Sequence, residues 1–304
     1  MGYLLAALAG GFLFFNSQAT PDKVAGRIET VLRRQFPGAQ VDVDIKGKRG
    51  LSVVKGKFRE VRLSMSNFKT AGVALPPVQM NPNPKKKGRL GRALVQLRDF
   101  DFNGIQVELA ELELGDVVYD LDALKKSQLG IVSVGPGRAH LIVSAAALQS
   151  LVQERVKDVK NARIALQNGQ LRLTGTRATP ILGDVPFALT ARPQVRNGNQ
   201  IWLANAVVTL GGQELPEALT QNIIGPLNPI FAFDDSKLPF RVALKTLSAR
   251  NDKIELSGDV SFVPLAATAT QPQTTTPQMS VPQATTPQAN TPMAAPPMSA
   301  TPVS

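Results

Sequence analysis

The 304-residue sequence contains no cysteine and only one histidine. Without cysteine the chain can form no disulfide, no thiolate nucleophile and no cysteine-ligated metal site. The one imidazole, His140, lies in the alternating segment 139–143, where a structural role is a simpler interpretation than that of a general base. The chain is therefore not expected to be an enzyme built on cysteine, metal or histidine chemistry.

Carboxylate pairs are the remaining candidates for acid–base catalysis. Glu111 and Glu113 lie in a strand-like alternation, and Asp234 and Asp235 lie in an expected loop, so solvated surfaces explain both pairs. Gly135-Pro136-Gly137 is not a phosphate loop, because no P-loop lysine with Ser or Thr follows it and a strand comes next. We therefore predict no catalytic residue, metal site or cofactor.

Aromatic residues are scarce, at 5% of the chain with one tryptophan and two tyrosines. Stacking platforms for single-stranded nucleic acid are hard to assemble from so few rings. The net charge of +11 still suggests a polyanionic partner, either nucleic acid or an acidic lipid surface. Since the sequence shows no recognition helix, zinc pattern or aromatic-studded strand, no nucleic-acid partner is expected.

The positive charge is concentrated in one part of the chain. Residues 20–100 contain 18 Lys and Arg against 6 Asp and Glu, whereas residues 101–264 contain 16 against 17. The densest cluster follows several prolines and is predicted to be an exposed basic loop between strands, with a solvated loop that binds nothing as the alternative. The candidate contacts with anionic headgroups are Lys85, Lys86, Lys87, Arg89 and Arg92.

The two ends differ in composition from the body. Tyr3–Phe15 is a run of 13 residues without charge, and it predicts a signal peptide or short membrane anchor at residues 1–19. A buried first helix is the alternative. An uncleaved helix of this length reaches only about 22 Å, which is too short to cross a hydrocarbon core of about 30 Å. Residues 265–304 carry no charge and repeat Thr-Pro and Pro-Gln pairs, which predicts a disordered tail. We expect one domain at residues 20–264 in an exported protein, periplasmic or associated with the envelope membrane.

Alternation with period two dominates the body. In the segment 41–46, valine and isoleucine alternate with charged residues, which is typical of a half-buried strand. Asn168-Gly169 and Asn197-Gly198 predict tight hairpins, and Asn251-Asp252 and Asn103-Gly104 are weaker examples. The body is therefore expected to be mainly antiparallel sheet with one wet face.

Three helices are predicted between the strands. The first covers about Pro21 to Gln35, with Thr20 as N-cap and proline in its first turn. The second begins after the N-cap Ser144 and continues to about Val156, and the third covers roughly residues 216–224. The last two helices are apolar enough that something other than water must cover them.

These two helices and the segment after the third suggest a groove for acyl chains. One chain of about 15 methylenes represents roughly 12 kcal/mol of gross driving force, so an aliphatic groove suffices for binding. An ordinary dry core is the alternative, since core and cavity linings use the same residues. The candidate lipid contacts are Leu148, Leu151, Val152, Ile223, Ile224, Leu227 and Phe231.

Several short blocks follow one another in an order that characterises a known family. They are Val41–Gly47, Gly56–Leu63, Gly137–Ser144, Leu210-Gly211-Gly212 with Leu215-Pro216, and Leu238-Pro239-Phe240. In this order, and over about residues 20–264, the chain resembles the LmeA-like phospholipid-binding family of bacterial envelope proteins. It departs from the family pattern in the charged insertion 81–92 and in its tail.

The resemblance implies an α+β fold: an elongated, curved antiparallel sheet with about three helices enclosing an apolar groove, similar to tubular lipid-binding domains. It also implies a phospholipid-binding protein of the bacterial cell envelope that holds acyl chains in an apolar channel and catalyses no reaction. Transfer of lipid between membranes is the natural extension. The competing hypothesis is a structural or scaffolding envelope protein whose β core fills itself.

Overall fold

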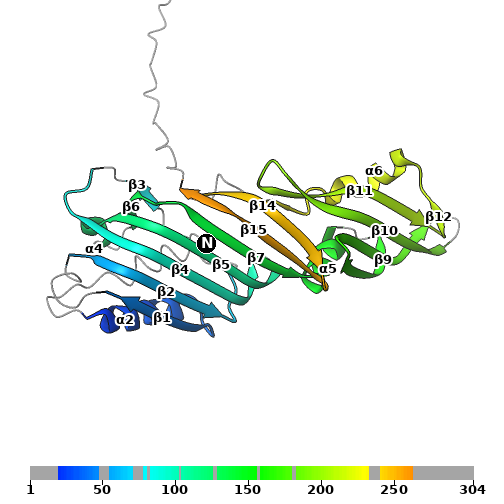
Figure 1. The fold of residues 1–304 in the computed structure, drawn as a ribbon. Coiled ribbons are helices and arrows are strands. Elements are labelled where there is room, and N and C mark those ends of the chain that lie inside the picture. Colours follow the sequence, from blue (N-terminus) through cyan, green and yellow to red (C-terminus); the bar gives the residue numbers. More distant parts are fainter. Residues whose placement is uncertain are drawn as a thin grey trace, which may run out of the picture. The chain divides into compact units, whose positions relative to one another are not determined.

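The computed structural model describes residues 20–47, 55–70, 78–80, 83–102, 104–125, 129–155, 158–179, 183–232 and 240–262. The chain divides into the units Met1–Ala267 and Thr268–Ser304, and every described residue lies in the first. In this unit the strands form a sheet of nine strands and a sheet of six (Figure 1). The predicted segments 1–19 and 265–304 lie outside the described residues.

The larger sheet combines strands from the first half of the chain with its last two strands. Its order is β1 (Gln40–Lys46), β2 (Lys57–Ser66), β4 (Lys87–Phe102), β5 (Ile105–Asp120), β7 (Gly137–Ser144), β15 (Lys253–Phe262) and β14 (Phe240–Arg250). Two short strands, β3 (Val78–Met80) and β6 (Leu129–Ser133), pair with each other, and β6 also pairs with β5.

The predicted antiparallel pairing holds for most strands and is wrong at two places. β2 pairs with β4 in parallel, and β3 pairs with β6 in parallel, whereas the other neighbours are antiparallel. A parallel pair needs a long connection that returns the chain to the end where it started. Residues 67–86 provide that connection between β2 and β4. Their sequence contains no signal that distinguishes a crossover to a parallel strand from an ordinary loop.

The smaller sheet is antiparallel throughout. Its main strands follow the chain as β8 (Val159–Gln167), β9 (Gln170–Thr179), β10 (Gly183–Arg196), β11 (Gln200–Leu210) and β12 (Gln213–Glu214). The sixth strand, β13 (Phe231–Ala232), pairs with β11.

Three hairpins predicted from Asn-Gly and Asn-Asp pairs are confirmed, whereas Asn103 of the fourth predicted pair lies outside the described residues. Asn168 and Gly169 have φ of 52° and 75° between β8 and β9, and Asn197 and Gly198 have φ of 54° and 69° between β10 and β11. Asn251-Asp252 turns β14 into β15 with φ of 51° and 56°. Asn and Asp tolerate this left-handed region better than other residues with a side chain, which explains their place in these turns.

The three predicted helices are present as α2 (Pro21–Gln35), α5 (Ala145–Arg155) and α6 (Glu217–Ile224). The described residues contain a fourth helix that was not predicted, α4 (Leu121–Lys125), and a 3-10 turn η1 (Gly225–Leu227). α4 is too short to show a helical period in the sequence. Its start is fixed by Asp120, whose Oδ1 accepts the backbone N–H groups of Asp122 and Ala123 at 2.9 and 3.1 Å.

The predicted N-caps of α2 and α5 are confirmed. Thr20 Oγ1 accepts the backbone N–H of Lys23 at 3.4 Å, and Ser144 Oγ accepts that of Ala147 at 3.2 Å. α2 packs against β1 and buries Ile28 and Leu32 completely. The first helix therefore covers the apolar side of the edge strand, as its stripe of aliphatic residues predicts.

The two sheets are joined at the outer edge of β14. The Leu244 N–H donates to the Gly198 carbonyl at 2.6 Å, and the Gly169 N–H donates to the Ala249 carbonyl at 2.9 Å. At the end of the same hairpin, Asp252 exchanges two hydrogen bonds with the Leu166 backbone, at 3.0 and 3.1 Å. Two hairpin tips of the smaller sheet thus satisfy backbone groups that an edge strand would otherwise expose.

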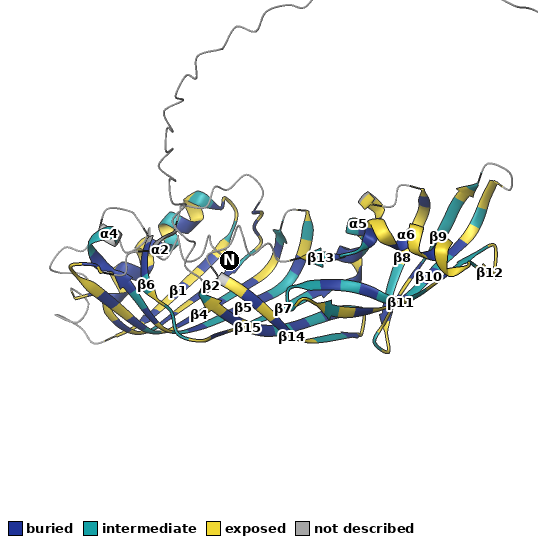
Figure 2. Ribbon diagram, turned by 90° about the horizontal axis from the view of Figure 1, so that it is seen from above, coloured by how far each residue is buried: buried dark blue, intermediate teal, exposed yellow. Residues whose placement is uncertain are grey.

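Buried and exposed residues alternate along most strands, and this alternation is visible in Figure 2. In β1, for example, Val41, Val43 and Ile45 are buried and the residues between them are exposed. The buried residues of both sheets belong to one continuous hydrophobic cluster. Its largest fully buried side chains are Ile28, Leu32, Leu63, Met65, Leu112, Ile131, Leu166, Leu171, Leu173, Leu189, Leu227 and Ile254.

Leu189 lies in β10 in the middle of the smaller sheet and is fully buried. The substitution Leu189→Ala should lower the free energy of unfolding by about 2–5 kcal/mol, because it leaves a cavity in close-packed surroundings. Val207→Ala, on the adjacent strand at a side chain that is 41% exposed, should change it by less than about 1 kcal/mol. Chemical denaturation measures both values, and equal losses would contradict this description of the core.

Candidate functional site

The seven apolar residues predicted to contact lipid lie on four elements, α5 and the three successive elements α6, η1 and β13. They are Leu148, Leu151 and Val152 on α5, Ile223 and Ile224 on α6, Leu227 on η1, and Phe231 on β13. The structure brings these elements together, because α5 contacts η1 and α6 contacts both η1 and β11. Arg155, at the end of α5, also donates from Nη1 to the Pro229 carbonyl at 2.8 Å.

The seven side chains divide into two groups by burial. Leu148, Val152, Ile224 and Leu227 are buried, each at 5% exposure or less. Leu151, Ile223 and Phe231 are partly buried and pack against the same hydrophobic cluster. The first group has the surroundings of core residues, and the second leaves apolar surface open for a further contact. Their role as lipid contacts stays a prediction.

The polar face of the larger sheet is hollowed into a groove of about 760 Å³. Its lining comes from β1, β2, β4, β5, β7, β14 and β15, and none of the seven apolar residues contributes to it. One row of residues that face each other across the strands consists of Asp44, Arg62, Leu94, Glu113, Arg138 and Asp259. Charges of opposite sign alternate along this row, so they stabilise one another on the sheet face.

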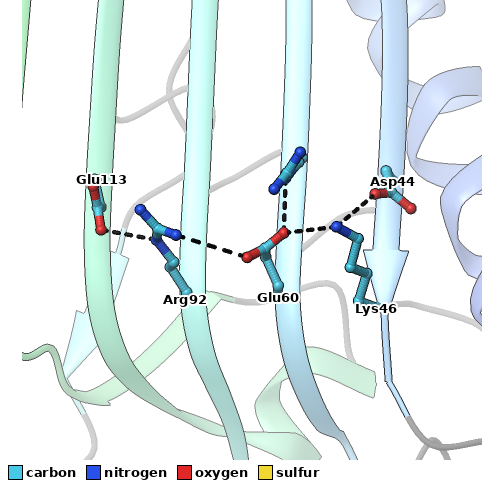
Figure 3. Close-up of polar contacts among 6 residues, drawn as sticks. Asp44, Lys46, Glu60, Arg92 and Glu113 are labelled. Atoms are coloured by element: carbon cyan, nitrogen blue, oxygen red, sulfur yellow. Dashed lines mark hydrogen bonds and ion pairs between the residues drawn. The ribbon is translucent and has the colours of Figure 1, made fainter.

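A network of ion pairs shares Arg62 and Glu113 with this row and joins β1, β2, β4 and β5 (Figure 3). Glu60 is at its centre and accepts hydrogen bonds from Lys46 Nζ at 3.2 Å and from Arg62 Nε at 2.7 Å. Arg92 lies 3.9 Å from Glu60 and donates from Nε to Glu113 at 2.8 Å. Glu60 and Glu113 are therefore both bound to cations on neighbouring strands.

The network also shifts the pKa values of its members. Desolvation raises the pKa of Glu60, whose side chain is only 15% exposed, but the hydrogen bonds from Lys46 and Arg62 outweigh it and lower the pKa below its usual value. The hydrogen bond from Arg92 lowers the pKa of Glu113 in the same way and raises that of Arg92 itself. Both carboxylates stay ionised at neutral pH.

The other candidates for catalysis lie on this polar face or outside the described residues. His140 Nδ1 is 3.6 Å from Glu111 Oε2, and the other oxygen of Glu111 accepts a hydrogen bond from Gln96 at 2.7 Å. Asp234 and Asp235 lie outside the described residues. Within the part of the chain that the structure describes, no three His, Asp or Glu residues are grouped as metal ligands, and no helix has the length and hydropathy to cross a membrane.

The prediction of a basic loop is corrected by the structure. β4 begins at Lys87, so Lys87, Arg89 and Arg92 belong to a 16-residue strand, and only Lys85 and Lys86 precede it. The alternation of apolar and polar residues in this strand is not apparent from the sequence, because the inward position 88 is a glycine and not an aliphatic residue.

The five basic residues also differ in their partners. Arg89 Nη2 pairs with Asp116 at 2.7 Å, and Arg92 belongs to the network around Glu60. Lys85, Lys86 and Lys87 are exposed, and no carboxylate of the described residues forms an ion pair with them. Of the predicted headgroup contacts, these three lysines are the ones without an ion-pair partner among the described residues.

A buried tyrosine that was not singled out from the sequence organises this end of the sheet. The Tyr119 hydroxyl donates to the Gly56 carbonyl at 2.7 Å, and the Arg89 N–H donates to the same carbonyl at 2.9 Å. Burial raises the pKa of Tyr119, so the hydroxyl keeps its proton and remains a donor. A Cβ on Gly88 would lie 2.3 Å from the tyrosine ring, and Gly56 has a φ of 62°. Only the pairing of distant segments reveals why both positions are glycine.

The smaller sheet carries a second hollow, of about 530 Å³, between α6 and strands β10 and β11. Arg196 lies 4.8 Å from the centroid of the Trp202 ring, and Trp202 Nε1 donates to Gln200 at 2.9 Å. Asn228 accepts the Leu203 N–H at 2.7 Å and donates to the Leu203 carbonyl at 3.1 Å. Arg196, Trp202 and Asn228 at this hollow thus have partners within the chain, and of the predicted residues only Ile224 lines it.

Comparison with protein families gives one match. A family model described as LmeA-like phospholipid-binding matches residues 86–259, which is more than half of the chain. The matched segment contains the whole smaller sheet and all seven predicted apolar residues. The comparison with curated proteins found no match, and neither did the comparison with solved structures.

The ion-pair network predicts how stability depends on pH. The pKa of Glu60 in the folded state is below the usual 4.5, so its contribution is fully present above that value and is lost as the pH falls below it through the folded pKa. The wild-type chain should therefore lose more stability between about pH 6 and about pH 3 than the variant Glu60→Gln does. Denaturant midpoints at both pH values test this. Glu214→Gln, at an exposed position, should behave as wild type. An identical change of the denaturant midpoint between the two pH values in all three proteins would contradict the role of Glu60.

The contact between Gly88 and Tyr119 predicts a steric effect. In Gly88→Ala, the added methyl group would overlap with ring atoms of Tyr119 and should lower the free energy of unfolding by about 1–3 kcal/mol. Gly26→Ala in α2 is the control, because a Cβ there meets nothing within 4 Å and should stabilise the helix by up to about 1 kcal/mol. Chemical denaturation gives both values. A Gly88→Ala protein as stable as wild type would show that the ring does not cover this glycine.

Proposed function

The chain belongs to the LmeA-like phospholipid-binding family, and on this basis we propose that it binds a phospholipid by burying the acyl chains in the apolar region formed by α5, α6, η1 and β13. The observation that carries the proposal is the family match, which includes this whole region. The partly buried side chains of Leu151, Ile223 and Phe231 support it, because they offer apolar surface next to the hydrophobic cluster.

The chemistry of the two sheet faces favours this location for the acyl chains. Each buried methylene contributes about 0.8 kcal/mol, so an aliphatic surface is sufficient to hold a chain. The groove on the polar face of the larger sheet is lined by residues such as Arg62, Glu113 and Asp259. Covering such charges with hydrocarbon would cost their hydration, so this groove does not suit acyl chains.

The proposed activity is binding, and the protein would then act by holding or transferring lipid and not by catalysing a reaction. The paired state of Glu60, Glu111 and Glu113 supports a non-catalytic role for the polar face. Export to the bacterial envelope, in the periplasm or at the membrane, is part of the proposal and rests on the composition of residues 1–19.

A scaffolding protein with a self-filled core is the second candidate. One observation favours it: Leu148, Val152, Ile224 and Leu227 are already buried by the chain itself. If the partly buried residues beside them close on one another in solution, no apolar surface is left for a ligand.

Extraction of the purified chain with organic solvent, followed by mass spectrometry, tests the proposal. We expect phospholipid to be extracted together with the protein, or to be taken up from added vesicles. Ile223→Ser should lower the bound lipid about tenfold or more, because it removes about 1.5–3 kcal/mol of apolar burial. Leu219→Ser on the same helix, at a side chain that is 50% exposed, should retain wild-type binding. A lipid-free protein that also takes up none from vesicles would favour the scaffold.

A further inference from the structure

The parallel pairing of β2 and β4 brings two basic segments to the same end of the larger sheet. Lys57 at the start of β2 lies opposite Arg89 near the start of β4. A Cβ built on Gly56 would lie 3.5 Å from Gly88 Cα, so the two segments are in close contact. We call the five lysines of these segments the basic platform: Lys55, Lys57, Lys85, Lys86 and Lys87.

The charges of the basic platform are not compensated by nearby carboxylates. All five side chains are exposed, and within the described part of the chain none of them forms an ion pair or a side-chain hydrogen bond. Two acidic residues of the same region are engaged elsewhere, since Asp116 pairs with Arg89 and the buried Asp120 caps α4. The platform therefore presents a concentrated positive field to solvent.

The backbone under the platform is held in place by buried contacts. The Gly56 carbonyl accepts hydrogen bonds from both the Tyr119 hydroxyl and the Arg89 N–H, at 2.7 and 2.9 Å. The Leu121 N–H donates to the Lys86 carbonyl at 3.0 Å, which connects the second segment to α4. The lysines thus stand on a preorganised surface, and little backbone entropy is lost when they bind.

We propose that the basic platform docks the protein on the surface of an anionic phospholipid bilayer. The choice of partner rests on the proposed function, since a protein that binds phospholipid must meet a membrane to obtain it. Lysine is a flexible point charge that suits a fluid layer of headgroup phosphates, whereas nucleic-acid sites add planar arginine or exposed aromatic contacts. Tyr119, which contacts Gly56 and Gly88 beside the platform, is buried.

Binding of the full chain to vesicles tests the proposal. Vesicles of phosphatidylcholine mixed with phosphatidylglycerol should bind the protein at low salt, and vesicles of phosphatidylcholine alone should not. Each lysine contributes about fivefold to membrane binding, so K85Q/K86Q/K87Q should weaken it about a hundredfold. K55Q/K57Q should weaken it about twenty-fivefold, although these residues are far from the triplet in the sequence.

The matched control removes three exposed arginines from the smaller sheet, in the variant R163Q/R172Q/R192Q. It changes the net charge as much as the triple lysine variant and should weaken binding by no more than about threefold. Circular dichroism confirms that each variant is folded. Equal losses in the two triple variants would overturn the proposal, because net charge alone would then explain binding.

Three further outcomes overturn it. They are wild-type binding by K55Q/K57Q, equal binding to the two kinds of vesicle, and tighter lysine-dependent binding to duplex DNA or RNA at the same salt. Lipid extracted with the protein is measured in parallel for every variant. A protein that retains its lipid but ignores anionic vesicles contradicts only the docking surface, whereas a lipid-free protein that binds them contradicts only the acyl-chain site.

Discussion

The parallel pairing of β2 with β4 is the constraint on which the rest of the larger sheet depends. It sets the register in which Glu60 faces Arg92 and in which Lys57 faces Arg89. One consequence is the ion-pair network from Lys46 to Glu113, and another is the contact of Gly56 with Gly88 under the buried Tyr119. Had these strands formed a simple hairpin, their starts would lie at opposite ends of the sheet and the basic segments would be apart.

The two faces of this sheet divide polar from apolar chemistry. On the polar face, several charged groups of the sheet bind partners on the neighbouring strand. The five lysines of the basic platform form no ion pair with the described residues, and this contrast marks them as a surface for a partner. On the apolar side, aliphatic residues of both sheets and of α2, α5 and η1 join in one cluster, the only environment described here that suits hydrocarbon.

The joint at β14 connects the larger sheet to the segment that carries the predicted lipid contacts. Hairpin tips around Gly169 and Gly198 hydrogen-bond to the edge of β14, and the β14–β15 turn binds back to Leu166 through Asp252. α5 runs from β7 of the larger sheet to β8 of the smaller one, and it contacts η1. A ligand held against α5 would therefore contact an element that connects the two sheets.

The sequence by itself determined the elements whose signals are local: the alternation of β1, the turns at Asn168 and Asn197, and the capped helices α2 and α5. It also located the apolar residues of α5 and α6. Tertiary structure alone decided the parallel strand pair, the short helix α4, the place of Arg92 in a strand, and the role of Tyr119. The physical reason is that these features depend on contacts between residues far apart in the chain. A glycine covered by a distant ring, or a lysine beside another segment's lysine, leaves no periodic trace in its own segment.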